Sequence, residues 1–403
     1  MGLRTIATHD WLSLFASYPS YIRIREARHE LYGSSSYQIV GGPSFKRHEA
    51  ASLEAARAIA SFLAQKYPQF FVTVPEGSHL SPDDGAQITG VRRLAHPQLG
   101  LPAKEWKLYE EELGGDNAWR VAGELVPDDL ALLLPDLEGE AEGQYRFIGG
   151  SICAAGFWRL DEKIGLTLRQ IHLTGKVAQY EERLMGPMDR WFTKLKPTTL
   201  AERNNYFFQV FSPEVTDPLA LLDEFHRGTL HPTKVGAEDA AALSLRGKRG
   251  QGALHDPVEL SWSHSSNGPE ALFDHTVKRS VVKPEDGIHY ERQAPPAATR
   301  PEEIAMRSER QTLRKLPKSG AVLFTIRTHL TPIPTMAKEP GVPGRLASAM
   351  RSWPEDVQWY KGVRRFRDVC LPYLDAAHEE QVASGIFTGS AEEILAAKRA
   401  YPF

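Results

Sequence analysis

Residues 306–332 read MRSERQTLRKLPKSGAVLFTIRTHLTP, and this stretch predicts a β-hairpin. A PKSG turn at 317–320 separates a polar, cationic run from a run of alternating character, as proline and glycine do between strands. Alternation is the period of a strand with two different faces. One face would carry Val322, Phe324 and Ile326, and the other Thr325, Arg327 and His329. A strand pair with so many polar and cationic residues is poorly suited to forming a core. We expect it to bind an anionic or polar ligand.

Two further stretches carry recognisable motifs: residues 149–172 read GGSICAAGFWRLDEKIGLTLRQIH, and residues 203–206 read RNNY. With the ERQTLRKLP run at 309–317, and in this order, they resemble the haem-dependent oxidative N-demethylase alpha-subunit family, a PAS-like haem enzyme family. The matching positions in the first stretch are Gly150, Trp158, Glu162, Lys163, Gly165, Ile171 and His172. The sequence departs from the family pattern at CAAGFW, 153–158, and at LTGKV, 173–177.

The composition sets limits on partners and location. The chain has 403 residues, of which 41% are hydrophobic and 25% charged, with a net charge of -3. This balance gives no reason to expect nucleic-acid binding, and no apolar run is long enough to predict a membrane span. Only two cysteines occur, Cys153 and Cys370, so we expect a reducing, cytoplasmic location. Two thiolates cannot supply four ligands to an iron–sulfur cluster, and the absence of Cys-x-x-Cys-His means that bound haem would be noncovalent.

The pattern of apolar residues predicts an α+β fold. Helices are expected at 50–67 and 180–195, with Pro187 kinking or splitting the second, and at 345–353 and 356–369. Strands are expected at 145–151, 166–173 and 204–211, and Ser390 with Glu393 would cap a last helix. The resemblance implies that the strands form a PAS-like antiparallel sheet with a haem pocket, wrapped by N- and C-terminal helices. We expect one domain over 1–403, with a loop-rich insertion at about 225–300.

The resemblance also implies a function. It implies an iron-dependent oxidoreductase, a monooxygenase that oxidises an N-methyl group of a small amine with O2 and releases formaldehyde. The expected cofactor is noncovalent haem b. Electrons would come from NADPH through a separate reductase that carries flavin and an iron–sulfur centre. The RGKR loop at 246–249 is a candidate contact for that partner, with a solvated loop as the simpler interpretation.

The same motifs suggest which side chains form the site. His172 is the expected proximal ligand of the iron, and Trp158 is an expected haem contact. Arg310, Arg314 and Arg327 would pair with the propionates, because guanidinium recognises carboxylates through two parallel hydrogen bonds. The expected catalytic groups are Glu309, Arg310 and Thr312.

Simpler interpretations stand beside these assignments. A lone histidine in a strand is more often a core or surface residue than an iron ligand. Glu309 with Arg310 suits a surface ion pair, and Glu162 with Lys163 a solvated turn. Asn204 and Asn205 are suited to satisfying buried backbone groups. Cys153 is the competing axial ligand, against its interpretation as a buried inert thiol.

Two other functions remain open at this stage. A haem-binding PAS-like sensor without turnover would use the same kind of pocket, because fold does not fix function. The departures at 153–158 and 173–177, together with the long insertion, also fit a haem oxidase that acts on a larger natural-product amine.

Overall fold

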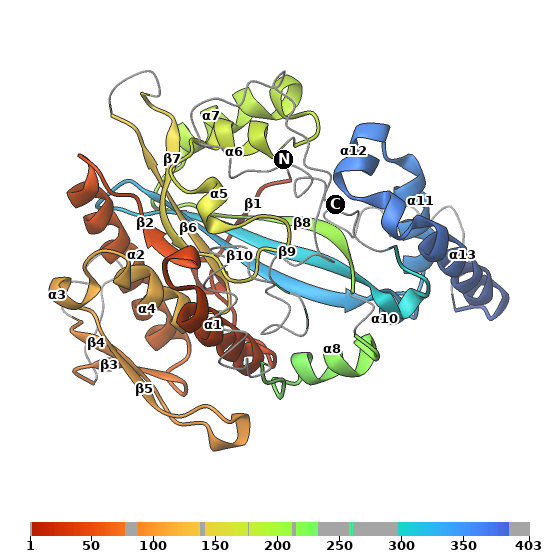
Figure 1. Ribbon diagram of the computed structural model, residues 1–403, viewed down its shortest axis with the longest axis horizontal. Helices are drawn as coiled ribbons and strands as arrows, with labels where there is room; N and C mark the ends of the chain where they lie inside the picture. Colours follow the sequence, from red (N-terminus) through yellow and green to blue (C-terminus); the bar gives the residue numbers. More distant parts are fainter. Residues whose placement is uncertain are drawn as a thin grey trace.

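A seven-stranded antiparallel sheet organises the computed structural model, in the strand order β1-β8-β9-β10-β6-β7-β2 (Figure 1). The structure describes residues 2–76, 88–137, 142–175, 177–211, 215–232, 258, 260 and 297–386. The strands are β1 (Arg4–Ile6), β2 (Tyr37–Ile39), β6 (Asp129–Pro135), β7 (Tyr145–Ser151), β8 (Leu200–Val210), β9 (Ile304–Lys315) and β10 (Val322–Pro332). The expectation of a mixed α+β fold with a large antiparallel sheet is confirmed.

The hairpin predicted from residues 306–332 is β9 and β10. They pair along their whole length, with Thr312 opposite Thr325. The turn closes where the Leu316 N–H donates to the Ala321 carbonyl over 2.7 Å, and Gly320 takes the positive φ of 71° that the turn requires. The alternation of side chains along β10 is confirmed, since Leu323 and Val322 belong to different hydrophobic clusters. The hairpin therefore gives the sheet two chemically different faces.

Helices α1 (Tyr18–Tyr32), α2 (Phe45–Lys66) and α4 (Asn117–Leu125) cover one face, which we call the helix face (Figure 1, lower left). The predicted helix at 50–67 is confirmed as most of α2, because its apolar residues recur every three or four positions and pack into one stripe. The main core lies here and includes Trp11, Trp119 and Leu132. Short α3 (Glu110–Leu113) and a small sheet of β3 (Phe71–Val74), β4 (Gly90–Arg93) and β5 (Lys104–Lys107) continue this side.

The opposite face, which we call the cavity face, is covered by the segment between β7 and β8. This segment holds α5 (Leu160–Lys163), α6 (Leu168–Thr174), a π-helical turn (Tyr180–Leu184) and α7 (Met185–Lys194). The helix predicted at 180–195 is therefore split where the π-helical turn meets α7, and Pro187 lies in the first turn of α7, where a missing N–H is tolerated.

The strand predicted at 166–173 is wrong, because most of it is helix α6. Thr167 begins the helix with a capping box. Its hydroxyl accepts the Gln170 N–H, and the Gln170 side chain accepts the Thr167 N–H. This local pairing satisfies the first orphan amides of a helix, and it outweighs the alternating pattern of the sequence.

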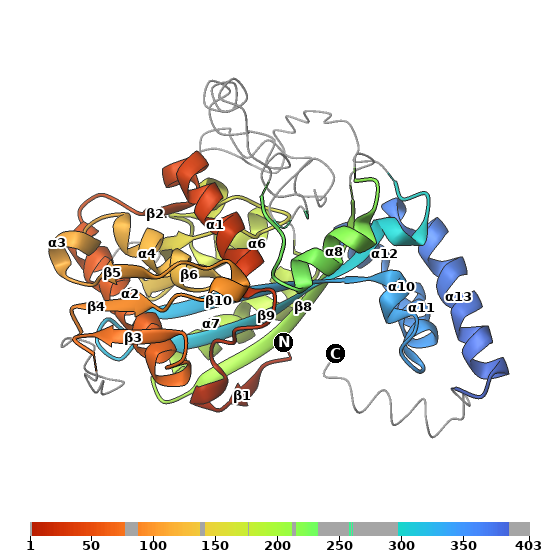
Figure 2. The same cartoon turned by 90° about the horizontal axis from the view of Figure 1, so that it is seen from below.

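The C-terminal helices gather at one end of the long strands β8 to β10 (Figure 2). They are α10 (Ile333–Met336), α11 (Val342–Ser352), α12 (Glu355–Tyr360) and α13 (Arg367–Ala383), with α8 (Pro218–His226) nearby. The predicted helix at 356–369 is divided by Gly362, whose φ is 65°, and by a 3-10 turn (Val363–Arg365). The loop 246–249, most of the insertion and the cap at Ser390 lie outside the described residues. Within the described ranges, no helix combines the length and apolarity needed to cross a membrane.

Candidate functional site

A cavity of about 290 Å³ lies between the cavity face and helices α5 to α7. Most of its wall is apolar, and aromatic and aliphatic side chains from helices and sheet face each other across it. From the helical side these are Trp158, Leu168, Ile171, Leu184, Met188 and Trp191, and from the sheet Ala131, Leu133, Phe147, Leu313, Phe324 and Ile326. A concave, mostly apolar site with a few polar groups is the usual form of a small-molecule or cofactor pocket.

His172 lines this cavity from α6. Its Nδ1 lies 2.7 Å from the Leu168 carbonyl oxygen, which can only accept, so Nδ1 carries the hydrogen and Nε2 keeps its lone pair. The ring stacks on Tyr180 with centroids 4.6 Å apart and planes 12° apart. Burial lowers the pKa of His172 to about 4, so the imidazole is neutral at neutral pH. A neutral, oriented imidazole is suited to ligating a metal.

Glu309 supplies a carboxylate to the wall and is only 8% exposed. The Gln311 side-chain amide donates to it over 2.8 Å, and that of Asn205 over 3.4 Å. The guanidinium Nε of Arg307 lies 4.0 Å from its other oxygen. These contacts fix the carboxylate at the cavity wall, where it can receive a cationic or proton-donating group.

Two cationic side chains also line the cavity, Lys163 from α5 and Arg203 from β8. Lys163 is 4% exposed. Burial lowers the pKa of Arg203, and the charge of Glu309 opposes that shift. Because residues 203, 205 and 207 alternate along β8, Arg203, Asn205 and Phe207 all reach the same wall.

An aromatic cluster closes part of the wall. Phe157 packs on Phe207 with ring centroids 4.5 Å apart, and Phe207 on Tyr360 at 5.4 Å. All three line the cavity, although they come from the loop after β7, from β8 and from α12.

The structure brings His172, Trp158 and Glu309 together around the cavity, and it does not bring the other predicted site residues there. Arg310, Thr312, Arg314 and Arg327 all point to the helix face. The Arg310 guanidinium donates to the Trp11 carbonyl over 2.9 Å and pairs with Glu202.

Arg314, Arg327 and Thr312 also make their contacts on the helix face. The guanidinium of Arg314 lies 4.4 Å from the ring centroid of Trp11, and that of Arg327 lies 4.1 Å from that of Tyr21. The Thr312 and Thr325 hydroxyls share a hydrogen bond of 2.6 Å. The sequence predicted the alternation but could not tell which face holds the cavity.

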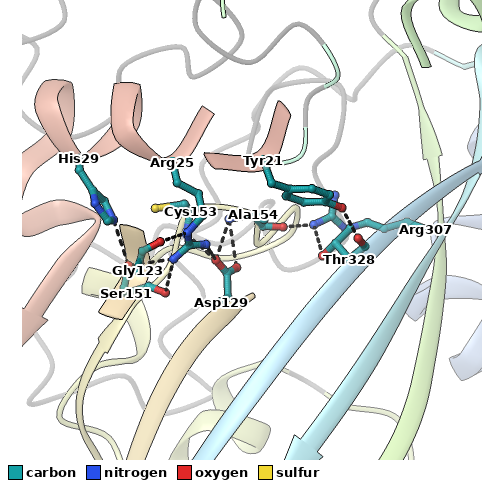
Figure 3. Close-up of polar contacts among 10 residues, drawn as sticks. All are labelled: Tyr21, Arg25, His29, Gly123, Asp129, Ser151, Cys153, Ala154, Arg307 and Thr328. Carbon is teal, nitrogen blue, oxygen red and sulfur yellow. Dashed lines mark hydrogen bonds and ion pairs between the residues drawn. The ribbon is translucent and has the colours of Figure 1, made fainter. Parts of the chain in front are cut away.

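Cys153 does not line the cavity either. It is 1% exposed, burial raises the pKa of its thiol, and its backbone N–H donates to Asp129 over 2.7 Å (Figure 3). A thiol with a raised pKa is protonated at neutral pH, and thiolate is the form that binds metals. This placement matches a buried, inert thiol.

Sequence reasoning assigned no cavity role to Lys163, Arg203, Asn205, Phe157 or Tyr360. Lys163 and Arg203 lie within the motifs at 162–165 and 203–206, and the two-residue period of β8 was the signal that joins Arg203 to Asn205. Phe157 and Tyr360 carry no local signal, since only tertiary packing brings them to the same wall. Among the residues that the structure describes, no group of three or more His, Cys, Asp or Glu side chains could hold a free metal ion.

Comparison with known protein families identifies the family of the chain. A family model described as "haem-dependent oxidative N-demethylase, alpha subunit-like" matches residues 2–249 and 258–371. The chain belongs to this family. The resemblance inferred from the three motifs is thereby confirmed over most of the chain. The description of the haem-dependent oxidative N-demethylase, alpha subunit-like family names an oxidative enzyme that depends on haem.

Proposed function

We propose that the chain binds b-type haem noncovalently in the cavity and oxidises a small N-methylated amine with O2, releasing formaldehyde. The observation that carries this proposal is His172, a neutral imidazole that lines an apolar cavity and whose Nδ1 is held by the Leu168 carbonyl. Haem requires such a ligand, apolar walls for the macrocycle and cations for its propionates. The side chains around this cavity fit all three needs.

The topology supports a PAS-like sheet as the scaffold. We number the strands 1 to 5 along the chain, from β6 to β10. In the sheet they then lie side by side in the order 2-1-5-4-3. The crossover from the second to the third of them carries α5 to α7, which form the far wall of the cavity. A PAS-like haem pocket would lie between these helices and this sheet.

The residues divide the task of holding haem. His172 would ligate the iron, with its ring orientation fixed by Leu168 and Tyr180. Trp158 and the aliphatic lining would contact the macrocycle, and Lys163 and Arg203 are the cations that line the cavity for the propionates. When bound, haem supplies the activation of O2 and the transfer of electrons.

The chain's own groups would bind and orient the amine. Glu309, held by Gln311 and Asn205, would attract a protonated amine and accept a proton from it. Phe157, Phe207 and Tyr360 would exclude water and contact methyl groups, and aromatic faces also attract ammonium groups. Orientation of the amine beside a fixed carboxylate is the protein's contribution to the rate.

Electrons would reach the site from a separate NADPH-dependent partner with flavin and an iron–sulfur centre. The support is the cysteine content, since the two cysteines of the chain are too few for such a cluster. Both are buried and free, Cys153 in the loop after β7 and Cys370 in α13.

An absorption spectrum of haem-supplemented protein, with and without dithionite and CO, tests the cofactor. We expect a Soret band, and acid–acetone should extract all of the haem. His172→Ala should lose haem or give a spectrum that added imidazole restores, whereas His226→Ala, in α8 outside the cavity lining, should leave the spectrum unchanged. An unchanged spectrum in His172→Ala would contradict the ligand assignment. Haem binding without formaldehyde release across a screen of methylated amines and suitable reductases would instead favour a sensor.

A further inference from the structure

Arg307 lies on β9 two residues before Glu309, and its side chain is completely buried. Burying a guanidinium is unfavourable unless its donors find partners. It donates to the carbonyl of Ala154, to the Thr328 hydroxyl over 3.3 Å and to the Gln209 side chain over 3.3 Å. Figure 3 shows it reaching from the sheet to the backbone of the loop after β7.

This loop, residues 153–157, is held from two sides. The Asp129 carboxylate accepts the N–H groups of Cys153 and Ala154 at 2.7 and 3.0 Å, while it pairs with buried Arg25 at 2.8 Å. Arg307 holds the carbonyl of the same Ala154. Two buried arginines therefore hold the backbone of Ala154. Arg25 does so through Asp129, which accepts the Ala154 N–H, and Arg307 donates to the Ala154 carbonyl (Figure 3).

The loop also passes directly against the guanidinium. A Cβ added to Gly156 would lie 2.9 Å from Cζ of Arg307, closer than real Cβ atoms come, and 3.0 Å from its Nε, tighter than most real Cβ contacts. Glycine at this position thus allows the close approach, and the next residue is Phe157 of the cavity wall.

Arg307 contacts the two functional parts of the cavity wall at once. Its Cζ is 5.8 Å from the ring centroid of Phe157, and its Nε is 4.0 Å from Glu309. The aromatic cluster and the carboxylate come from different segments of the chain, and this one guanidinium lies within the range of a cation–π contact with the first and an ion pair with the second. A shift of about 1 Å in such a group can change rates about a hundredfold.

We propose that Arg307 is a positioning residue that fixes Phe157 and Glu309 relative to each other, and so sets the orientation in which the cavity receives an amine. The part that concerns the amine rests on the proposed function. The part that concerns the loop does not, because the contacts that hold the loop join Arg307 to other residues of the chain.

Two substitutions disturb the contact in different ways. Arg307→Lys keeps the positive charge but loses the forked set of donors. Gly156→Ala keeps Arg307 and pushes the loop away from it. Arg93→Lys is the matched control, since Arg93 is 1% exposed and lies on β4 of the small sheet, outside the cavity lining.

Amide hydrogen exchange of the whole chain reads the loop directly. At residues 153–157 we expect exchange to become about tenfold faster in Arg307→Lys and Gly156→Ala, and to stay unchanged in Arg93→Lys. Unchanged exchange in both Arg307→Lys and Gly156→Ala would overturn the proposal, and so would an equal acceleration in Arg93→Lys.

Calorimetric binding of dimethylammonium to the folded proteins separates positioning from general stability. We expect Arg307→Lys and Gly156→Ala to bind the probe about tenfold more weakly than the wild type, and Arg93→Lys to keep the wild-type affinity. If the wild type binds this probe and all three variants bind it with the wild-type affinity, the proposal fails. If the wild type does not bind it, the amine site of the proposed function fails, and hydrogen exchange alone decides the role of Arg307.

Discussion

The two faces of the β9–β10 hairpin carry different polar residues and use them for different purposes. On the helix face, Arg310, Arg314 and Arg327 are bound to backbone carbonyls, a carboxylate or aromatic rings. On the cavity face, Glu309 and Gln311 leave polar atoms at the wall of an open space. The arginines at 310, 314 and 327 thus support the sheet from the helix face, and Glu309 and Gln311 face the cavity.

This contrast teaches that charge in a motif does not identify the side of a sheet on which a cavity lies. Arg310, whose guanidinium donates to the Trp11 carbonyl and pairs with Glu202, has little capacity left for a propionate or a substrate. Each face should therefore respond differently to mutation: the cavity face in function, the helix face in stability.

Glu309→Gln is the sharpest test on the cavity face, with the largest expected effect. The substitution keeps the size of the side chain and removes its charge and its ability to accept a proton. We expect formaldehyde release to fall about 10²-fold or more, with the haem spectrum and the melting temperature close to those of the wild type. Exposed Glu339→Gln is the control and should keep full activity. Equal rates in wild type and Glu309→Gln would remove Glu309 from the site.

Arg310→Met tests the helix face, where the effect should appear as lost stability. Glu202 is 2% exposed and, among the described residues, would keep Arg4 alone as an ionic partner. Leaving a buried carboxylate underpaired lowers the free energy of unfolding by about 3 kcal/mol, which urea denaturation can measure. Arg4→Met, whose side chain is 58% exposed, should cost less than about 1 kcal/mol. Haem affinity that falls in Arg310→Met without a loss of stability would instead support the sequence-based assignment to the propionates.

The sequence predicted the hairpin and its alternation because both follow from local patterns: a PKSG turn and a two-residue period. It could not tell which face holds the cavity, since that depends on segments 100 or more residues away. Helices α1 and α2 cover one face and α5 to α7 the other, and no local pattern in 306–332 encodes that choice.

The cavity residues show the same limit at a smaller scale. The motif indicates His172, but the alternating pattern around it predicts a strand, whereas the capping box of Thr167 and Gln170 begins a helix. Tyr360 reaches the wall from the C-terminal helices, a contact that no pattern in the sequence indicates.

The smallest expected effect is a pH dependence carried by His329 on the helix face. Burial lowers the pKa of His329 to about 3, with smaller contributions from Arg327, His226 and Arg310, and its ring packs on Phe15 at 5.3 Å. In the unfolded chain a histidine has a pKa of about 6.5. As the pH falls from 6.5 towards 3, the unfolded state therefore binds a proton before the folded state does, and stability present above pH 6.5 is lost. His329→Gln removes this titration. In urea denaturation between pH 7 and 4, the wild type should lose on the order of 1 kcal/mol relative to the variant, allowing for partial solvent exposure. A difference between wild type and variant that stays constant across this range would show that His329 is not held neutral by the helix face.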